Sequence, residues 1–478
     1  MLDKKKFYIN GEWIDPKSNQ TIDIINPATE DVCAKISLGN KEDVNEAVQS
    51  AKNAFKTWAF STKEERLAPL EKLYELYKKR WADIAEAITL EMGAPKDFAT
   101  KLQAGTGAAH IKTFIRYLKE FNFEKPLGEH AKNQRIIYEP KGVCALITPW
   151  NWPMNQTCLK VMPAIASGCT MVLKPSEVAP LSAMILTELI HEANFPKGVF
   201  NLVNGYGPIV GAALSEHEKV DMMSFTGSTR AGIAVAQASA STVKRVQQEL
   251  GGKSANIILD DVADLEKSVK GGAGHCFLNS GQSCNAPTRM LVSSNNYDKA
   301  VEVAIATANS TTVGDPNGEF RMGPISNKAQ YEKVIKMIEI GIGEGAKLVA
   351  GGVEKPEGYE KGYYVKPTVF ADVTNDMTIA KEEIFGPVLC LIKYETEDEA
   401  IEIANDTEFG LAGYVQGELS HAIEVGNQIR AGQITINGGA RGNAAPFGGY
   451  KASGNGREHG KHGIEECLET KAIIAPAS

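Results

Sequence analysis

Apolar residues recur at helical spacing in two early segments, 41–59 and 62–93. In the second segment they are Leu67, Leu70, Leu73, Tyr77 and Trp81. A repeat of three to four residues predicts one amphipathic helix in each segment. Gly93-Ala94-Pro95 predicts where the second helix ends.

From about residue 140 the pattern changes to short apolar runs that alternate with helical segments. The runs lie at 142–150, 169–175, 198–205, 220–227 and 254–261. Helical segments between them include 180–193 and 230–249. Continuous apolar runs of this length predict strands buried on both faces, and their alternation with helices predicts a parallel α/β sheet.

A second α/β series follows residue 253. We expect its strands at 289–294, 364–373, 386–394, 413–419 and 432–438, and its helices near 297–308, 328–343 and 397–406.

Two segments fit neither series. Residues 123–142 predict a hairpin or a long strand pair, and 467–478 predict a terminal strand. An exposed terminal strand is an unpaired edge that a second subunit can cover, so we expect a homo-oligomer, a dimer or a tetramer.

Composition narrows the class of protein. The 478 residues exceed what one compact core usually holds, and 43% hydrophobic with 23% charged residues is typical of a globular protein. A net charge of −8 without a long basic run argues against nucleic acid and anionic membranes as partners. Neither a signal peptide nor an apolar stretch of membrane-spanning length is visible. The eight cysteines include no C-x-x-C pair, which favours reduced thiols and a cytoplasmic location.

Two stretches carry features of a phosphate or ribose site. "SFTGSTRAG" (224–232) follows an apolar strand and opens a helix, where free N–H groups attract phosphate. Its spacing is not G-x-G-x-x-G, and packing or capping is an alternative role. In "LKPSEVAPLSA" (173–183), Glu177 at a strand end could accept ribose hydroxyls or could be a solvated helix cap.

Cys284 in "FLNSGQSCNAPTR" (277–289) has neither a disulfide partner nor a second metal ligand nearby in the sequence. A lone cysteine is usually an inert buried thiol. Its neighbours Gln282, Ser283 and Asn285 favour a polar pocket instead. The preceding segment predicts a helix ending near the cysteine, and a helix C-terminus would not lower the thiol pKa.

Five stretches together resemble the aldehyde dehydrogenase superfamily, in order and over nearly the whole chain. They are "EPKGVCALITPWNWPMNQTCLK" (139–160), "QQELGGKSANIIL" (247–259), "SGQSCNAPTR" (280–289), "KEEIFGPV" (381–388) and "PFGGYKASGNGREHG" (446–460). The resemblance points to the NAD(P)-dependent, hydrolytic branch.

The resemblance implies a catalytic set. Cys284 matches the nucleophile, which would form a thiohemiacetal and then a thioester. Asn151 matches the oxyanion donor, acting with the Cys284 backbone N–H. Glu249 matches the base that activates water for hydrolysis, although a Glu ending an Ala-rich helix is usually a solvated charge. Lys160 and Glu458 match a proposed proton relay, and ordinary ion pairing is the alternative.

The resemblance also implies the binding residues. NAD is the expected cofactor because the Glu177 carboxylate would repel the 2′-phosphate of NADP, which stays possible. The implied cofactor residues are Thr148, Trp150, Lys174, Ser176, Glu177, Gly207, Gly211, Gly227, Ser228, Leu250, Glu383 and Phe385. The implied aldehyde pocket is lined by Trp152, Gln156, Leu159, Ser283, Asn285 and Phe447.

The identity of the aldehyde stays open. Arg441, in the Gly- and Ala-rich loop 437–447, could bind a carboxylate at the pocket mouth or simply face solvent. No metal site is expected, because His459 and His462 have no further ligands at metal-binding spacing.

Two other classes of function stay open besides NAD-dependent oxidation of an aldehyde to its acid. One is a coenzyme-A-acylating dehydrogenase or thiol esterase that uses the same cysteine, and Glu249 argues against acylation. The other is a non-catalytic binding protein on the same fold, which would be expected to lack the cysteine, asparagine or glutamate.

We therefore predict an α/β fold in three parts. Residues 1–122 and 143–252 would form a Rossmann-like, parallel-sheet NAD-binding domain. Residues 253–460 would form an α/β catalytic domain, and 123–142 with 461–478 a small β oligomerisation element.

Overall fold

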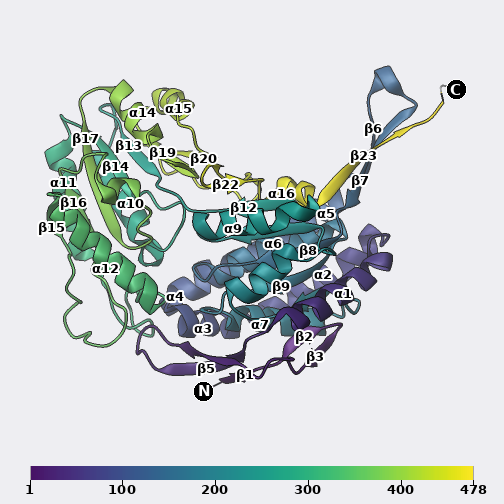
Figure 1. The fold of residues 1–478 in the computed structure, drawn as a ribbon. Coiled ribbons are helices and arrows are strands. Elements are labelled where there is room, and N and C mark those ends of the chain that lie inside the picture. Colours follow the sequence, from purple (N-terminus) through teal and green to yellow (C-terminus); the bar gives the residue numbers. More distant parts are fainter. Residues whose placement is uncertain (1, 477–478) are drawn as a thin grey trace.

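Two large sheets organise the protein, whose structure is a computed structural model describing residues 2–476 (Figure 1). The first sheet has eight strands in the order β22-β12-β11-β8-β9-β10-β2-β3, and the second has seven in the order β15-β16-β17-β14-β13-β19-β20. Both are mainly parallel; the first carries antiparallel strands at both edges and the second at one. The predicted α/β fold with two parallel-sheet regions is confirmed.

The first sheet is built from the apolar runs that the sequence predicts as strands. Its parallel strands are β8 (Val143–Ile147), β9 (Thr170–Lys174), β10 (Phe200–Leu202), β11 (Met222–Thr226) and β12 (Arg245–Glu249). Its antiparallel edge strands are β2 (Phe7–Ile9), β3 (Glu12–Ile14) and β22 (Gly454–Asn455).

Helices cover both faces of the first sheet. They are α1 (Lys41–Trp58), α2 (Lys63–Lys79), α3 (Trp81–Met92), α5 (Ala104–Glu120), α6 (Pro153–Ser167), α7 (Leu181–Glu192), α8 (Ala212–Glu216) and α9 (Thr229–Ser239). Alternate residues of β8 enter different cores: Cys144 and Leu146 pack with residues of α2, α3, α5, α6 and α7, whereas Val143 and Ala145 pack with α1 and α8. Burial on both faces explains the continuous apolar run of this strand.

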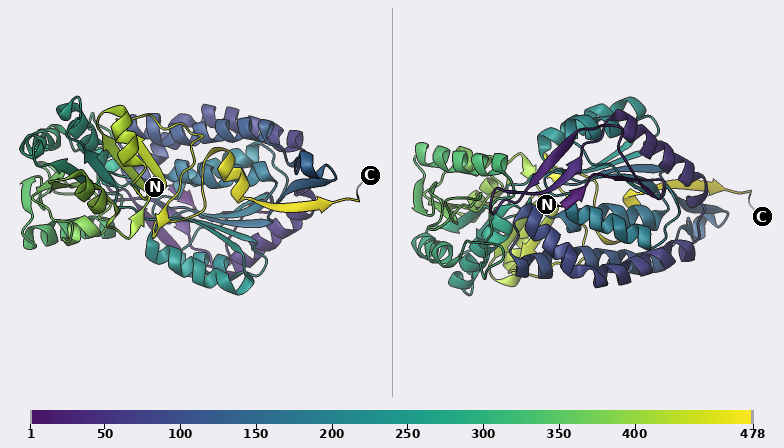
Figure 2. Two further views of the ribbon diagram at one scale, coloured as in Figure 1. Left: turned by 90° about the horizontal axis from the view of Figure 1, so that it is seen from above. Right: turned by 90° about the horizontal axis from the view of Figure 1, so that it is seen from below.

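The second sheet lies at the other end of the molecule (Figures 1 and 2). Its parallel strands are β13 (Ala255–Ile258), β14 (Arg289–Ser293), β16 (Thr368–Ala371), β17 (Val388–Tyr394), β19 (Ala412–Gln416) and β20 (Gln433–Ile436), with β15 (Lys347–Ala350) antiparallel. Its helices are α10 (Leu265–Phe277), α11 (Tyr297–Ser310), α12 (Lys328–Gly343), α13 (Thr378–Lys381), α14 (Glu397–Asn405) and α15 (Leu419–Gly426).

A three-stranded antiparallel arm projects from the first sheet region, away from the second sheet (Figures 1 and 2). It contains β6 (Glu124–Pro126), β7 (Gln134–Pro140) and β23 (Leu468–Ile474), in the order β23-β7-β6. The sequence predicts these strands, and residues 477–478 of the predicted terminal strand lie outside the described residues. The helix α16 (Gly460–Glu466) leads into the arm.

Smaller elements complete the chain. The strands β1 (Leu2–Lys4), β5 (Val32–Ser37) and β4 (Thr21–Ile25) form a separate sheet, and β18 (Phe409–Gly410) pairs with β21 (Tyr450–Lys451). Short helical turns are α4 (Lys96–Phe98), η1 (Ala99–Gln103), η2 (Glu129–Ala131), η3 (Gly207–Gly211), η4 (Ala240–Thr242) and η5 (Leu278–Gly281). No helix among residues 2–476 is long and apolar enough to cross a membrane.

Two helix predictions are wrong in extent. The segment 230–249 holds α9 only to Ser239, after which Val243 adopts a left-handed conformation (φ 55°) and the chain continues as β12. Glu249 therefore ends a strand rather than a helix. The predicted helix 62–93 is broken at Arg80, whose φ/ψ of −101° and 15° lie outside the helical region, although Gly93 caps its end as predicted.

The division into domains stays a prediction. The first sheet ends with β12 at Glu249 and the second begins with β13 at Ala255, on either side of the predicted boundary. After β20 the chain returns to the first sheet, because β22 pairs with β12.

Candidate active site

The segment before Cys284 is held in an unusual backbone conformation. Asn279, Ser280 and Gly281 all have left-handed φ values of 55°, 56° and 72°. Gly281 also needs its small size, because a Cβ there would lie 2.1 Å from the backbone of Gly386. Such backbone persists only where neighbouring contacts fix it, and it is concentrated at functional sites. This turn directly follows α10, and Cys284 comes three residues after it.

Side-chain amides lock this turn. Asn279 Nδ2 donates to the carbonyl oxygens of Gln282 (3.2 Å) and Asn151 (2.9 Å), and Gln282 Nε2 donates to the Asn279 carbonyl (3.0 Å). Gln103 Nε2 also donates to the Asn151 carbonyl, at 3.0 Å. The nucleophile segment and the start of α6 are thus joined through buried hydrogen bonds.

The Asn151 side chain points to the nucleophile segment. Its Nδ2 donates to the carbonyl oxygen of Gln282 at 3.0 Å, and the residue is buried. Since an amide nitrogen carries two hydrogens, the second is available to another acceptor. Asn151 can therefore donate to an oxyanion formed next to Cys284.

Cys284 differs from most cysteines of the chain. All eight are free thiols, and only Cys33 and Cys284 are partly exposed. Burial of its sulfur raises the pKa of the Cys284 thiol to about 12, with contributions from the Glu383 and Glu249 carboxylates, while Arg441 acts in the opposite direction. The resting group is a thiol rather than a thiolate at neutral pH.

Glu249 lies at the end of β12, where it is 1% exposed. Its Oε1 accepts a hydrogen bond from Gln247 Nε2 at 3.3 Å, and its Oε2 has no hydrogen-bond partner among the described residues. Burial, followed by the charge of Glu458, raises the pKa of the Glu249 carboxyl well above its ordinary value. An acid with a raised pKa in a dry environment is suited to taking up and releasing a proton during turnover.

Lys160 and Glu458 form an ion pair that is linked to Glu249 through other buried side chains. Lys160 Nζ contacts Glu458 Oε1 at 2.8 Å and donates to Ser224 Oγ at 3.0 Å. Ser224 Oγ donates to Gln247 Oε1 at 2.5 Å, and Gln247 reaches Glu249. These buried side chains link Glu249 to Glu458 by hydrogen bonds. Because Gln247 donates an amide N–H to Glu249, this link positions the carboxylate and cannot take up its proton. The proton-relay role of Lys160 and Glu458 stays a prediction.

Several predicted cofactor residues lie together at the carboxyl ends of the parallel strands of the first sheet. Thr148, Lys174, Gly227 and Leu250 adjoin the carboxyl ends of β8, β9, β11 and β12, and Gly207–Gly211 form a helical turn after β10. Ligands of parallel α/β sheets bind outside these strand ends.

Side-chain contacts hold the predicted cofactor residues in place on both sides of these strand ends. Lys174 Nζ pairs with Glu177 Oε2 at 3.1 Å, and Ser228 caps α9 by accepting from the Ala231 N–H at 3.3 Å. At the other end, Glu383 Oε1 accepts from the Gly252 N–H at 2.8 Å. Phe385 packs edge-to-face on Trp150, with ring centroids 5.5 Å apart.

The predicted aldehyde pocket is partly brought together. Trp152 Nε1 donates to Ser283 Oγ at 2.8 Å, and the Asn285 side chain contacts the hydroxyl of Tyr414 at 3.4 Å. Gln156 is buried, and its Oε1 has no partner among the described residues. Leu159 packs in the main core of the first sheet region at 2% exposure.

The chain matches known proteins over nearly its full length. The family described as "Aldehyde dehydrogenase family" matches residues 13–473. A 3-succinoylsemialdehyde-pyridine dehydrogenase from Pseudomonas sp. is 52% identical over 99% of each chain. A crystal structure of an aldehyde dehydrogenase from Bartonella henselae is 51% identical, with a TM-score of 0.98 over 99% of this chain and 100% of that one.

This chain belongs to the aldehyde dehydrogenase family. Aldehyde dehydrogenase C from Pseudomonas syringae, solved as a cysteine-to-alanine mutant with NAD+ and octanal, is also similar. It is 51% identical, with a TM-score of 0.97 over 99% of this chain and 98% of that one.

Sequence reasoning missed the residues that support this aldehyde dehydrogenase site. Gln103, Ser224, Gln247 and Asn279 are all buried and hydrogen-bonded to the predicted catalytic residues or to their backbone. The available signal was a polar residue inside a predicted buried strand, as at Ser224 in "VDMMSFTG". Gln103 lies far from every recognised motif and gives no such signal.

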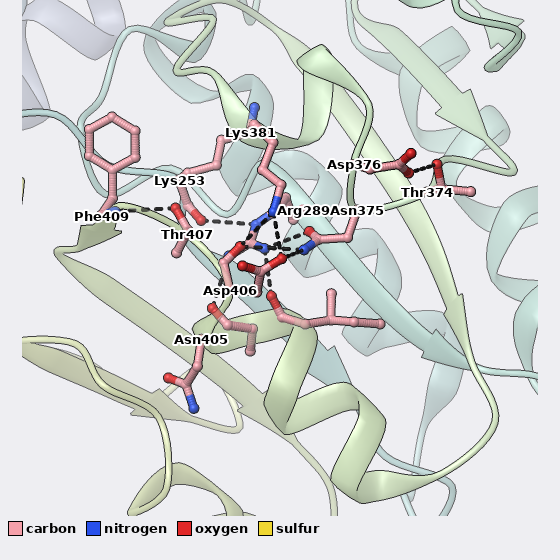
Figure 3. Close-up of polar contacts among 12 residues, drawn as sticks. Lys253, Arg289, Thr374, Asn375, Asp376, Lys381, Asn405, Asp406, Thr407 and Phe409 are labelled. Carbon is pink, nitrogen blue, oxygen red and sulfur yellow. Dashed lines mark hydrogen bonds and ion pairs between the residues drawn. The ribbon is translucent and has the colours of Figure 1, made fainter.

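A buried arginine anchors the segment between Glu249 and the second sheet (Figure 3). Arg289 Nε donates to the Lys253 carbonyl at 3.1 Å, and its other nitrogens donate to Asn375 Oδ1 (3.1 Å) and to carbonyls at the end of α14. This fixes the chain beside Gly252, where a Cβ would lie 2.2 Å from the Cys284 carbonyl oxygen. Arg289, the first residue of β14, thereby joins the strand that follows the Cys284 segment to the segment that follows Glu249.

Proposed function

We propose that this aldehyde dehydrogenase oxidises an aldehyde to its carboxylic acid with NAD, through a thioester on Cys284. The main support is the joint placement of Asn151 and Cys284, since the Asn151 amide already donates to the Gln282 carbonyl, two residues before the nucleophile. The buried Glu249, linked to Lys160 and Glu458, supports hydrolysis as the second half of the reaction.

The residues at the sheet edge fit a dinucleotide. The Glu177 carboxylate contacts Lys174 through one oxygen, so it keeps acceptor capacity for ribose hydroxyls. The free N–H groups at the start of α9, after Gly227, suit the pyrophosphate, and Glu383 with Phe385 would hold the nicotinamide end. When bound, NAD supplies the hydride acceptor. Structures of similar aldehyde dehydrogenases from Pseudomonas syringae and Bacillus cereus are NAD+ complexes.

In the first half of the reaction, the Cys284 thiol loses its proton to water and its sulfur attacks the aldehyde carbon. The negative charge that develops on the aldehyde oxygen is stabilised by the Asn151 amide and the Cys284 backbone N–H. Collapse of this thiohemiacetal expels hydride from the carbon and leaves a thioester on Cys284.

In the second half, Glu249 takes a proton from water, which attacks the thioester carbon and releases the acid with Cys284 restored as leaving group. Because the Glu249 pKa is raised, the proton must be removed before each hydrolysis. This proton passes to water, while the hydrogen bonds through Gln247, Ser224 and Lys160 to Glu458 hold the Glu249 carboxylate in place.

The decisive experiment measures NADH absorbance when purified protein is mixed with NAD and a panel of aldehydes, without coenzyme A. We expect steady NADH production that disappears in Cys284→Ala. NADH production that requires coenzyme A would favour an acylating enzyme, and ester cleavage without NADH would favour the esterase alternative. The same assay with NADP tests Glu177, whose replacement by serine should improve NADP use.

We also propose that the arm assembles the protein into a homo-oligomer. Residues 469–474 of β23 are exposed, and Ile473 and Ile474 are exposed by 44% and 72%. An exposed strand with apolar side chains invites pairing with another chain. Light scattering at micromolar concentration should give the mass of a dimer or tetramer, and a monodisperse monomer would contradict this.

A further inference from the structure

Arg441 lies against the wall predicted for the aldehyde pocket. Its guanidinium sits over the Phe447 ring, 5.0 Å from the centroid. Phe447 is 6% exposed, and its backbone pairs with that of Glu458. The loop that carries Arg441 therefore reaches the catalytic region rather than remote solvent.

A hollow of about 860 Å³ has both Arg441 and Asn285 in its wall. It is lined by Arg441, by Asn285, which directly follows Cys284, and by Tyr414 and His275. The Tyr414 hydroxyl donates to the Asn285 carbonyl at 2.8 Å, which closes one wall. This volume lies in the range of small-molecule sites.

The positive charge of Arg441 is not matched by the protein. Among residues 2–476 no carboxylate lies within ion-pair distance of it, and its guanidinium donates one hydrogen bond, from Nη1 to Gln433 Oε1 at 3.3 Å. The acid in the lining of the hollow, Asp264, accepts from the Lys267 N–H and caps α10. Several guanidinium N–H groups are therefore left for a ligand.

The positive charge of Arg441 acts on ionisable groups in the hollow and behind Phe447. Besides burial, Arg441 lowers the pKa of His275 in the lining and of His110 and His459 behind Phe447. Lowered pKa values keep these imidazoles neutral at neutral pH, so the cationic side chains of the lining are Arg441 and Lys267. A planar guanidinium binds a carboxylate through two parallel hydrogen bonds.

We propose that Arg441 selects the substrate: it binds the carboxylate at the far end of an aldehyde that carries an acid group, while the aldehyde carbon meets Cys284. This inference rests on the proposed aldehyde oxidation. The alternative is that Arg441 only packs on Phe447 as a cation–π contact and plays no part in selection.

The test compares neutral and acidic aldehydes of equal chain length, such as pentanal with 5-oxopentanoate and hexanal with 6-oxohexanoate. NADH formation is measured for the wild type, Arg441→Gln, Arg441→Lys and the control Arg430→Gln, which removes an exposed arginine eleven residues earlier in the chain. We expect the wild type to prefer one of the acids by at least about tenfold in kcat/KM.

Arg441→Gln should lower kcat/KM for that acid by about 30-fold, mainly through KM, and change the value for the neutral aldehyde by less than about threefold. Arg441→Lys should recover part of the loss, and Arg430→Gln should behave as wild type. A wild-type preference for neutral aldehydes, or an equal loss for both classes in Arg441→Gln, would overturn the proposal.

Absence of turnover with every aldehyde would count against the proposed function without deciding the role of Arg441. Binding is therefore measured separately, by calorimetry of glutarate and adipate on Cys284→Ala and on Cys284→Ala with Arg441→Gln. Binding that is lost with Arg441 supports the proposal, and equal or absent binding in both proteins contradicts it.

Discussion

The nucleophile segment, 278–285, and the loop 437–446 both border the catalytic region, but they are held very differently. In the first, Asn279 and Gln282 are buried and hydrogen-bonded to the backbone around them. In the second, residues 437–443 are all exposed, and the side chain of Arg441 makes one long hydrogen bond. Catalytic groups need fixed geometry, whereas a recognition loop tolerates looser support, so chemistry and selection are expected to respond differently to mutation.

The largest expected effect comes from the nucleophile itself. Cys284→Ala should abolish aldehyde oxidation, because no second partly exposed thiol lies in this segment. NAD affinity should stay within about twofold, since the sheet-edge contacts do not involve the sulfur. Stopped-flow absorbance measures turnover and fluorescence titration measures binding, and residual turnover in the variant would show that another group attacks the aldehyde.

Glu249→Gln should separate the two halves of the reaction. Hydride transfer does not need the carboxylate, so an NADH burst close to one per active site should precede turnover slowed by about 10²-fold. Rapid-mix absorbance resolves the two phases. Loss of the burst together with turnover would assign Glu249 to the first half instead.

Asn151→Ala removes the side-chain donor and should lower kcat by roughly 10²–10³-fold. Because the Asn151 side chain also supports the Gln282 carbonyl, the alkylation rate of Cys284 must be measured in parallel. An unchanged alkylation rate with lower kcat identifies oxyanion stabilisation. Normal kcat would remove Asn151 from the mechanism.

Asn279→Ala tests whether the support of the nucleophile segment matters. It removes three buried hydrogen bonds and leaves alanine in a left-handed conformation, which asparagine adopts more readily. We expect kcat to fall by about tenfold or more, because a small displacement of the nucleophile is costly. The matched control is Asn194→Ala, a left-handed asparagine (φ 63°) after α7. It should leave kcat unchanged, and similar kinetics in both variants would mean that the support is merely structural.

Sequence predicts much of this arrangement, and the misses have identifiable causes. The buried strands of both sheets follow from continuous apolar runs, as at β9 and β17. The end of α9 cannot be predicted in this way. Helical propensity continues through Ala240, but residues 245–249 pair with β11 and β22 and so form a strand of the sheet. The roles of Cys284, Asn151 and Glu249 rest on family resemblance, and their supporting contacts from Gln103 and Asn279 depend on tertiary proximity that local patterns do not encode.

The smallest expected effect links the two loops through charge. The Cys284 pKa of about 12 means that the thiolate fraction, and with it the rate of alkylation by iodoacetamide, should rise about tenfold per pH unit between about pH 7 and about pH 10. Arg441 opposes this rise in pKa, so Arg441→Gln should slow alkylation at a given pH by about twofold. Measurements belong in a Cys33→Ser background, because Cys33 is the other partly exposed thiol. A rate that does not change in Arg441→Gln would mean that the charge on the recognition loop is screened from the nucleophile, so that this loop could act on substrate alone.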